Sequence, residues 1–161
     1  MTDDPNQLVL NEYAIYEHPL FLQQMETLAQ EIEQESPNGH AGKSAKAKLM
    51  SRILTEMDNI AAKPDDAKYR LGKTMGGEYK HWRRAKFMGR YRLFFRYDSI
   101  EKIIIFVWVN DENTKRTYGS KTDAYAVFKK MLEQGNPPDK WEDLLKSISD
   151  RQLSNRPDKD N

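Results

Sequence analysis

The residues best suited to chemistry lie in the middle of the chain, where arginines recur at every second position. In residues 89–97, GRYRLFFRY, basic and apolar side chains alternate, and a period of two is typical of a β-strand. Such a strand carries Arg90, Arg92 and Arg96, with Phe94 between them, on one face and apolar side chains on the other. Guanidinium groups stay charged and bind phosphate oxygens through paired hydrogen bonds. The pattern therefore predicts a sheet face that contacts a phosphate backbone.

RNA suits such a face, because it supplies its own nucleophile, the 2′-hydroxyl group. An enzyme then has to align that hydroxyl, remove its proton, protonate the leaving 5′-oxygen and neutralise the phosphate. A well-placed proton-transfer group contributes about 10²–10⁴-fold to the rate, and a preorganised charge contributes about 10²–10³-fold. The candidates are Arg92 in the strand, Lys86 on the strand before it, and Arg116 and Tyr118 in the loop after the next strand. We therefore expect ribonuclease chemistry that needs no metal ion and no cofactor.

Two other interpretations of the basic face stay open. Asp65 and the triplet Glu78-Tyr79-Lys80 match the pattern of a nuclease whose two carboxylates bind Mg²⁺. The triplet follows two glycines, however, so we expect it in a loop and not in the strand that this pattern requires. Alternatively, the face belongs to an RNA- or ribosome-binding module without catalysis, which the composition does not exclude. His81, beside the basic strand, is a candidate proton shuttle, although a surface histidine is the commoner case.

The strands that must position these residues are predicted from the same periodicity. Residues 103–108 form a nearly unbroken apolar run, so the strand that contains them is expected to be central and covered on both faces. Short turns at Met88-Gly89 and Asp98-Ser99 would join neighbouring strands. The predicted strands are residues 68–71, 82–87, 90–97 and 102–110.

Helices are predicted on both sides of the strand region. The first begins at Pro19 and ends before residue 36, and the second covers residues 44–61. Asp123 is expected to cap a third helix, and Asp139 together with Glu142 a fourth. The fold class is therefore α+β: an antiparallel sheet with two N-terminal helices and two C-terminal helices.

Length and composition favour one soluble domain. The 161 residues are enough for a single core, with residues 1–18 as an extended arm and residues 149–161 as a frayed tail. The chain contains no cysteine, which favours a reducing cytoplasm, and no apolar run approaches the roughly 20 residues of a membrane helix. Although the net charge is only +1, residues 70–96 hold nine basic residues and one acid. This segregation indicates an anionic partner for the middle of the chain.

Three long blocks of the sequence closely resemble the YhaV family of bacterial toxins. They are GRYRLFFRY at residues 89–97, NDENTKRTYG at residues 110–119 and KTDAYAVFKKML at residues 121–132. The resemblance continues through GNPPDKWE at residues 135–142 and reaches back to residues 16–19, so it covers most of the chain.

The resemblance implies a toxin of a type II toxin–antitoxin system and a branch of the RelE-like ribonuclease superfamily. In that superfamily helices pack on one face of an antiparallel sheet, and RNA is cleaved on the other. Such toxins cut RNA, typically messenger RNA, either free or on the ribosome, and so stop translation. The implied partner is an antitoxin similar to PrlF, and operator DNA is bound only through the toxin–antitoxin complex.

The resemblance also implies roles for individual residues. An arginine in the strand and an arginine and a tyrosine in the later loop would serve the phosphate and the proton transfer. Basic residues on the preceding strand would contact RNA. The resulting candidates for catalysis are Arg92, Arg116 and Tyr118, and those for RNA binding are Arg84, Lys86, Arg90, Arg96 and Lys121.

Overall fold

Strand β5 (Ile103–Val109) occupies the centre of the sheet, and all seven of its residues are buried. The computed structural model describes residues 7–35, 44–111 and 123–155, and within them the sheet has five strands in the order β1-β2-β5-β4-β3. A run of Ile, Val, Phe and Trp suits extended backbone that is buried on both faces. The predicted central position of this strand is confirmed.

The strands on either side of β5 differ in direction. β4 (Tyr91–Asp98) and β3 (Arg83–Phe87) follow one another as antiparallel neighbours on one side. On the other side β2 (Tyr13–Glu17) runs parallel to β5, and β1 (Val9–Leu10) pairs antiparallel with β2. Two stretches of the predicted extended arm are therefore strands, and the sheet is mostly, not wholly, antiparallel.

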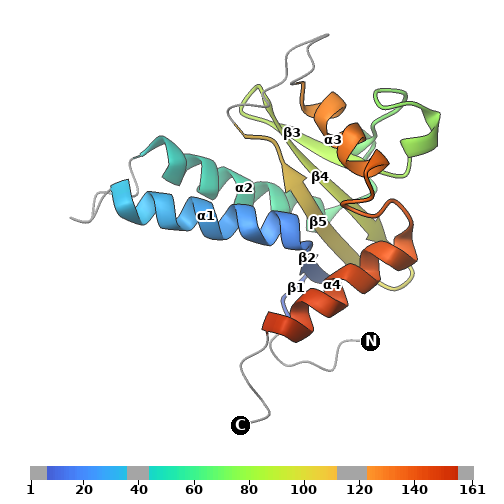
Figure 1. Cartoon of the computed structure of the whole chain (residues 1–161), viewed down its shortest axis with the longest axis horizontal. Coiled ribbons are helices and arrows are strands. Elements are labelled where there is room, and N and C mark those ends of the chain that lie inside the picture. The colour runs from blue at the N-terminus through green and yellow to red at the C-terminus, as the bar shows by residue number, and fades with distance from the viewer. Residues whose placement is uncertain (1–6, 36–43, 112–122, 156–161) are drawn as a thin grey trace.

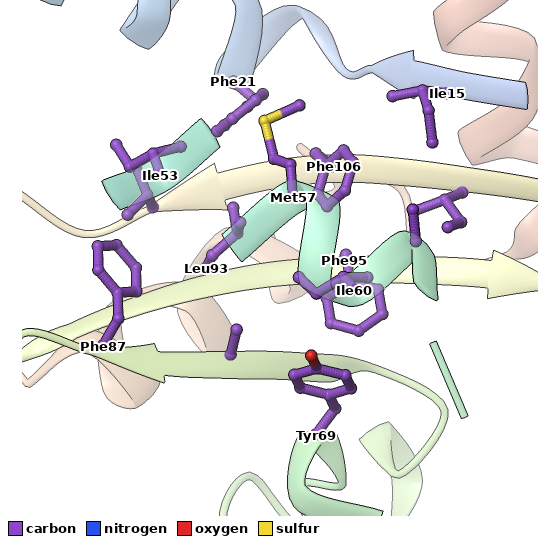
Figure 2. Packing of buried hydrophobic residues seen from close by; sticks show 14 of the residues in the cluster. Ile15, Phe21, Ile53, Met57, Ile60, Tyr69, Phe87, Leu93, Phe95 and Phe106 are labelled. Atoms are coloured by element: carbon purple, nitrogen blue, oxygen red, sulfur yellow. The ribbon is translucent and has the colours of Figure 1, made fainter. Parts of the chain in front are cut away.

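Two helices cover one face of the sheet and form the first core. α1 (Pro19–Glu35) and α2 (Ala45–Ala62) lie side by side and extend away from the sheet, as Figure 1 shows. The hydroxyl of Ser44 accepts a hydrogen bond from the Ala47 amide at 3.0 Å and caps α2. Figure 2 shows Ile60 of α2 packed with Phe95 and Tyr69, whose rings meet edge to face at 5.4 Å. The alternation of apolar side chains along β4 is thus confirmed on this face.

Two further helices cover the opposite face, which carries the arginines. α3 (Ala124–Glu133) and α4 (Trp141–Asn155) pack there, and Phe128 of α3 stacks on Phe94 at 4.2 Å and on Trp108 at 5.7 Å. The resemblance implied helices on one face and an open surface on the other, and this expectation is wrong for the middle of the sheet. The physical reason is that Phe94 and Trp108 stand on the arginine face and have to be buried.

One local prediction before β3 is wrong, and another is confirmed. Residues 67–69 form a 3₁₀ helix, η2 (Ala67–Tyr69), and only Arg70 bridges to β3, so the strand predicted at residues 68–71 is wrong. The Asp66 carboxylate accepts a bond from the Lys68 amide and turns the chain there. Glu78 lies in a second 3₁₀ helix, η3 (Gly77–Tyr79), outside any strand, as its glycines predicted.

The Asp139 side chain does not cap α4 as predicted. Its Oδ1 accepts a hydrogen bond from Trp82 Nε1 at 2.7 Å and lies 2.6 Å from His81 Nε2, while α4 begins two residues later. The helix itself continues to Asn155, past the start of the predicted tail at residue 149. None of the described helices combines the length and the apolar character needed to cross a membrane.

Candidate active site

Arg84 and Arg92 stand on neighbouring antiparallel strands and reach the same point. Arg84 pairs with Phe94 across the β3–β4 ladder, and Lys86 pairs with Arg92, so all four side chains share one face. The two arginines are 7% and 8% exposed. Arg84 Nε donates to the Tyr125 hydroxyl at 2.7 Å, and Arg92 Nε donates to the same hydroxyl at 3.1 Å. One tyrosine oxygen of α3 therefore holds two guanidinium groups together.

The other hydrogen bonds of the two arginines go to neutral backbone oxygens. Arg84 Nη1 donates to the carbonyls of Lys68 at 3.3 Å and Arg70 at 2.8 Å. Arg92 Nη1 donates to the carbonyls of Gly89 at 3.0 Å and Tyr91 at 2.8 Å. In the part of the chain that the structure describes, no carboxylate forms an ion pair with either arginine, and the Nη2 atom of each makes no hydrogen bond.

This arrangement has a clear electrostatic consequence. Two like charges that are almost fully removed from water repel each other and lose hydration, and hydrogen bonds to neutral oxygens offset this only in part. Lys86, directly opposite Arg92 on β3 and exposed, adds a third cation. A binding partner with negative charge would relieve the repulsion. The two Nη2 groups, fixed from rigid strands, suit the oxygens of a phosphate.

Asn110 connects this site to the end of β5. Its side chain is buried: Oδ1 accepts a hydrogen bond from the Arg92 amide at 2.6 Å, and Nδ2 donates to the Arg90 carbonyl at 3.0 Å. Asn110 stands two residues before the undescribed residues 112–122, and Tyr125 stands three residues after them. The connection between β5 and α3 therefore leaves from and returns to residues that touch Arg92.

The structure brings together some of the predicted site residues and not others. Arg84, Lys86 and Arg92 share the site, and Arg90 lies exposed in the turn beside it. Arg96 belongs elsewhere, because it is two pairs of residues further along β4, about 13 Å away at the usual rise of a strand. Arg116, Tyr118 and Lys121 lie outside the described residues.

Arg96 is engaged within the fold. Its guanidinium lies 5.1 Å from the ring centre of Trp82 and 5.5 Å from that of Trp141, and Nη1 donates to the Asp139 carbonyl at 2.8 Å. Burial lowers the pKa of Arg96, and nearby Asp139 partly opposes this. The guanidinium therefore attaches the α3–α4 connection to the sheet. His81, the candidate proton shuttle, also contacts Asp139 and so lies at this end, not beside Arg92.

Two residues of the site were missed in the sequence. Tyr125, Phe128 and Leu132 recur at helical spacing and are all buried, so Tyr125 was on the apolar stripe of α3. A tyrosine on a buried stripe needs a hydrogen-bond partner for its hydroxyl group. This need was the feature of the sequence that could have indicated a role for Tyr125 in the site. Asn110 ends an apolar strand and is itself buried, but nothing in its neighbours pointed to Arg92.

Metal-binding groups do not gather at the described part of this site. Among the residues that the structure describes, no group of three or more His, Asp or Glu side chains has the geometry to hold a metal ion. What the described site offers is positive charge in fixed positions, which can bind and orient a phosphate.

Comparisons with known proteins agree with this chemistry. Residues 15–149 match the protein family described as a toxin with endonuclease activity, of a toxin–antitoxin system. The chain is 44% identical over 147 residues to the ribonuclease toxin YhaV of Escherichia coli strain K12, covering 88% of this chain and 95% of the relative. It has the same identity and coverage to the toxin YhaV of Escherichia coli O157:H7. No solved structure matches the chain at a significant level. The chain belongs to the YhaV family of toxins.

Proposed function

We propose that this protein is an endoribonuclease toxin that cleaves RNA by attack of the 2′-hydroxyl, without a metal ion, and thereby inhibits translation. The observation that carries the proposal is the convergence of Arg84 and Arg92, which are almost buried and whose acceptors among the described residues are all neutral. Because no described carboxylate pairs with these two charges, the site is suited to an anion, and the similarity to a ribonuclease toxin supports RNA as that anion.

In the proposed reaction the arginines hold the scissile phosphate. The 2′-oxygen forms a bond to phosphorus, and the bond from phosphorus to the 5′-oxygen breaks. The proton of the 2′-hydroxyl passes to a base, and a proton passes to the leaving 5′-oxygen. The products are a 2′,3′-cyclic phosphate and a 5′-hydroxyl end. Negative charge grows on the phosphate oxygens in the transition state, so fixed guanidinium groups bind that state more tightly than the substrate.

The proton-transfer groups are assigned to the connection between β5 and α3. Arg116 and Tyr118 keep the roles that the family resemblance implies, phosphate binding and proton transfer, and Lys121 keeps its role in RNA binding. Support comes from the two anchors of this connection, since Asn110 and Tyr125 both touch Arg92. A segment fixed at both ends beside the phosphate site can place a side chain over it.

The proposed partners follow from the same surface. The antitoxin is expected to resemble PrlF and to cover the cationic end of the sheet with acidic groups, because no described carboxylate pairs with Arg84 or Arg92 at this end. Operator DNA would be bound only through the toxin–antitoxin complex. The substrate is messenger RNA in the cytoplasm, either free or on the ribosome.

The test is incubation of the purified protein with a defined RNA in EDTA, with and without ribosomes, followed by analysis of the fragment ends. Cleavage in chelator with cyclic phosphate ends supports the mechanism, and strict dependence on Mg²⁺ would refute it. Arg92→Ala should lower the cleavage rate by about 10²–10³-fold, whereas Lys48→Ala, a surface cation on α2, should not. If Arg92→Ala reduces RNA binding and toxicity in equal proportion, the alternative of a non-catalytic RNA- or ribosome-binding inhibitor is favoured.

A further inference from the structure

The connection between β3 and β4 has an unusual backbone. Met88 has a φ of 48° and Gly89 a φ of 77°, and the Arg90 amide donates to the Met88 carbonyl at 2.9 Å. Glycine and asparagine adopt this left-handed region readily, whereas a side chain such as methionine is strained there. Met88 therefore adopts a backbone conformation that its side chain disfavours.

Met88 is one of five large apolar side chains that are exposed in the described part of the chain. It is 49% exposed, and the cations Lys86 and Arg90, two residues before and after it, are exposed as well. Arg92 Nη1 donates to the Gly89 carbonyl at 3.0 Å, so the turn is in direct contact with the phosphate site. A strained backbone and an exposed apolar group thus coincide beside the functional arginines. Departures from local rules that coincide at a site indicate a use for the side chain.

The turn is held firmly in place. Asn110 Nδ2 donates to the Arg90 carbonyl at 3.0 Å, and its Oδ1 accepts from the Arg92 amide at 2.6 Å. On the other face of the hairpin, Phe87 and Tyr91 stack at 5.5 Å. The Met88 side chain therefore projects from a fixed base and not from a loose loop. A group that is fixed before binding loses little freedom when it contacts a ligand.

We propose that Met88 contacts a nucleobase next to the phosphate held by Arg84 and Arg92, and so contributes to the choice of cleavage site. The proposal rests on the proposed function. When the arginines bind a phosphate of RNA, the bases of the two adjoining nucleotides project from the site. The exposed thioether offers these bases an apolar, polarizable surface. Sulfur contacts with aromatic rings are favourable by about 0.3–1.5 kcal/mol. This corresponds to roughly 2- to 10-fold in kcat/KM.

The test compares Met88→Asn with the wild type. Asparagine fits the left-handed backbone, so the variant should be more stable, with a Tm higher by about 2–4 °C. If the side chain contacts a base, kcat/KM on a defined RNA should nevertheless fall by roughly 2- to 10-fold, and the distribution of cleavage sites should change. The matched control is Lys102→Asn, because Lys102 has a φ of 59° in the turn at the opposite end of the sheet. That variant relieves the same strain but also loses the contact of Lys102 Nζ with the Tyr13 ring centre at 4.9 Å, and it should leave the cleavage sites unchanged.

The outcomes separate this inference from the proposed function. If the wild type does not cleave RNA, both proposals fail. If it cleaves and Met88→Asn cleaves the same sites at the same rate, only the role of Met88 is overturned. The role is also overturned if Met88→Asn keeps wild-type cleavage but is no longer neutralised by the purified cognate antitoxin, because the turn would then serve a protein partner.

Discussion

Among the described residues, the Tyr125 hydroxyl joins the two arginines, and Tyr125→Phe removes only that group. The oxygen accepts bonds from Arg84 Nε at 2.7 Å and from Arg92 Nε at 3.1 Å. Hydrogen bonds from charged donors contribute about 1.5–3 kcal/mol each. Because both guanidinium groups keep their backbone acceptors, we expect a loss of about 3 kcal/mol in all. In a chain of this size that lowers the Tm by about 6–12 °C.

The effect of Tyr125→Phe on catalysis should exceed its effect on binding. Both charges remain, so the dissociation constant for a non-cleavable RNA should change by less than about 3-fold. Without the shared acceptor the guanidinium groups shift, and a displacement of about 1 Å can cost 10²-fold in rate. We therefore expect kcat to fall by about 10²-fold. The rate is measured at a temperature at which the variant is still folded. Tyr97→Phe is the matched control, because Tyr97 packs on the opposite face of β4 and loses only a hydroxyl.

A double-mutant cycle decides how Tyr125 acts. If it serves only to position Arg92, then Tyr125→Phe should cost little in a protein that already carries Arg92→Ala. Fully additive losses would instead show that Tyr125 touches the substrate by itself. A kcat within about 3-fold of the wild type, at a temperature where the variant is folded, would refute the claim that the shared hydroxyl organises the site.

Two further outcomes follow from buried polar residues. Asn110→Ala removes a buried hydrogen bond from the Arg92 amide and a partly buried one to the Arg90 carbonyl, so we expect about 2–4 kcal/mol of destabilisation by urea unfolding and a lower kcat. His18 is 2% exposed, and burial lowers its pKa from 6.5 to about 4. The contribution of the neutral His18 side chain to stability is therefore fully present above pH 6.5 and is lost as the pH falls toward 4. Between pH 7.5 and 5 the loss should be about 2 kcal/mol in urea unfolding. His18→Asn, which can still accept from the Leu20 amide, should lack this loss, and an equal loss in the variant would contradict the assignment.

Local patterns predicted the strands and helices well because those elements are encoded locally. Alternation placed Leu93 and Phe95 on one face of β4 and Arg92 on the other, and the structure agrees, since Arg92 contacts Tyr125 of the second core. The parallel pairing of β2 with β5 was missed because it joins Ala14 to Ile103, residues far apart in sequence, and no local pattern encodes such contacts. The strand predicted at residues 68–71 failed because Asp66 favours a turn there.

The site was harder to predict, because its residues are distinguished by their partners and not by their type. Arg92 and Arg96 stand on the same strand face, so the sequence pattern does not distinguish between them. In the fold, Arg96 lies between two tryptophan rings, and a backbone carbonyl accepts its Nη1. Arg92 shares one hydroxyl with a second cation and has no described anionic partner.

This contrast between the two ends of the sheet is the physical basis for locating the site. At one end two aromatic rings and a backbone carbonyl enclose the Arg96 guanidinium, so this side chain is engaged within the fold. At the other end Arg84 and Arg92 repel each other, and Met88 is strained beside them. A fold that was selected for stability alone would replace these groups, because uncharged side chains pack there at lower cost. Their presence is explained if an anion completes the site, because a bound phosphate would supply the negative charge that the described residues do not place beside them.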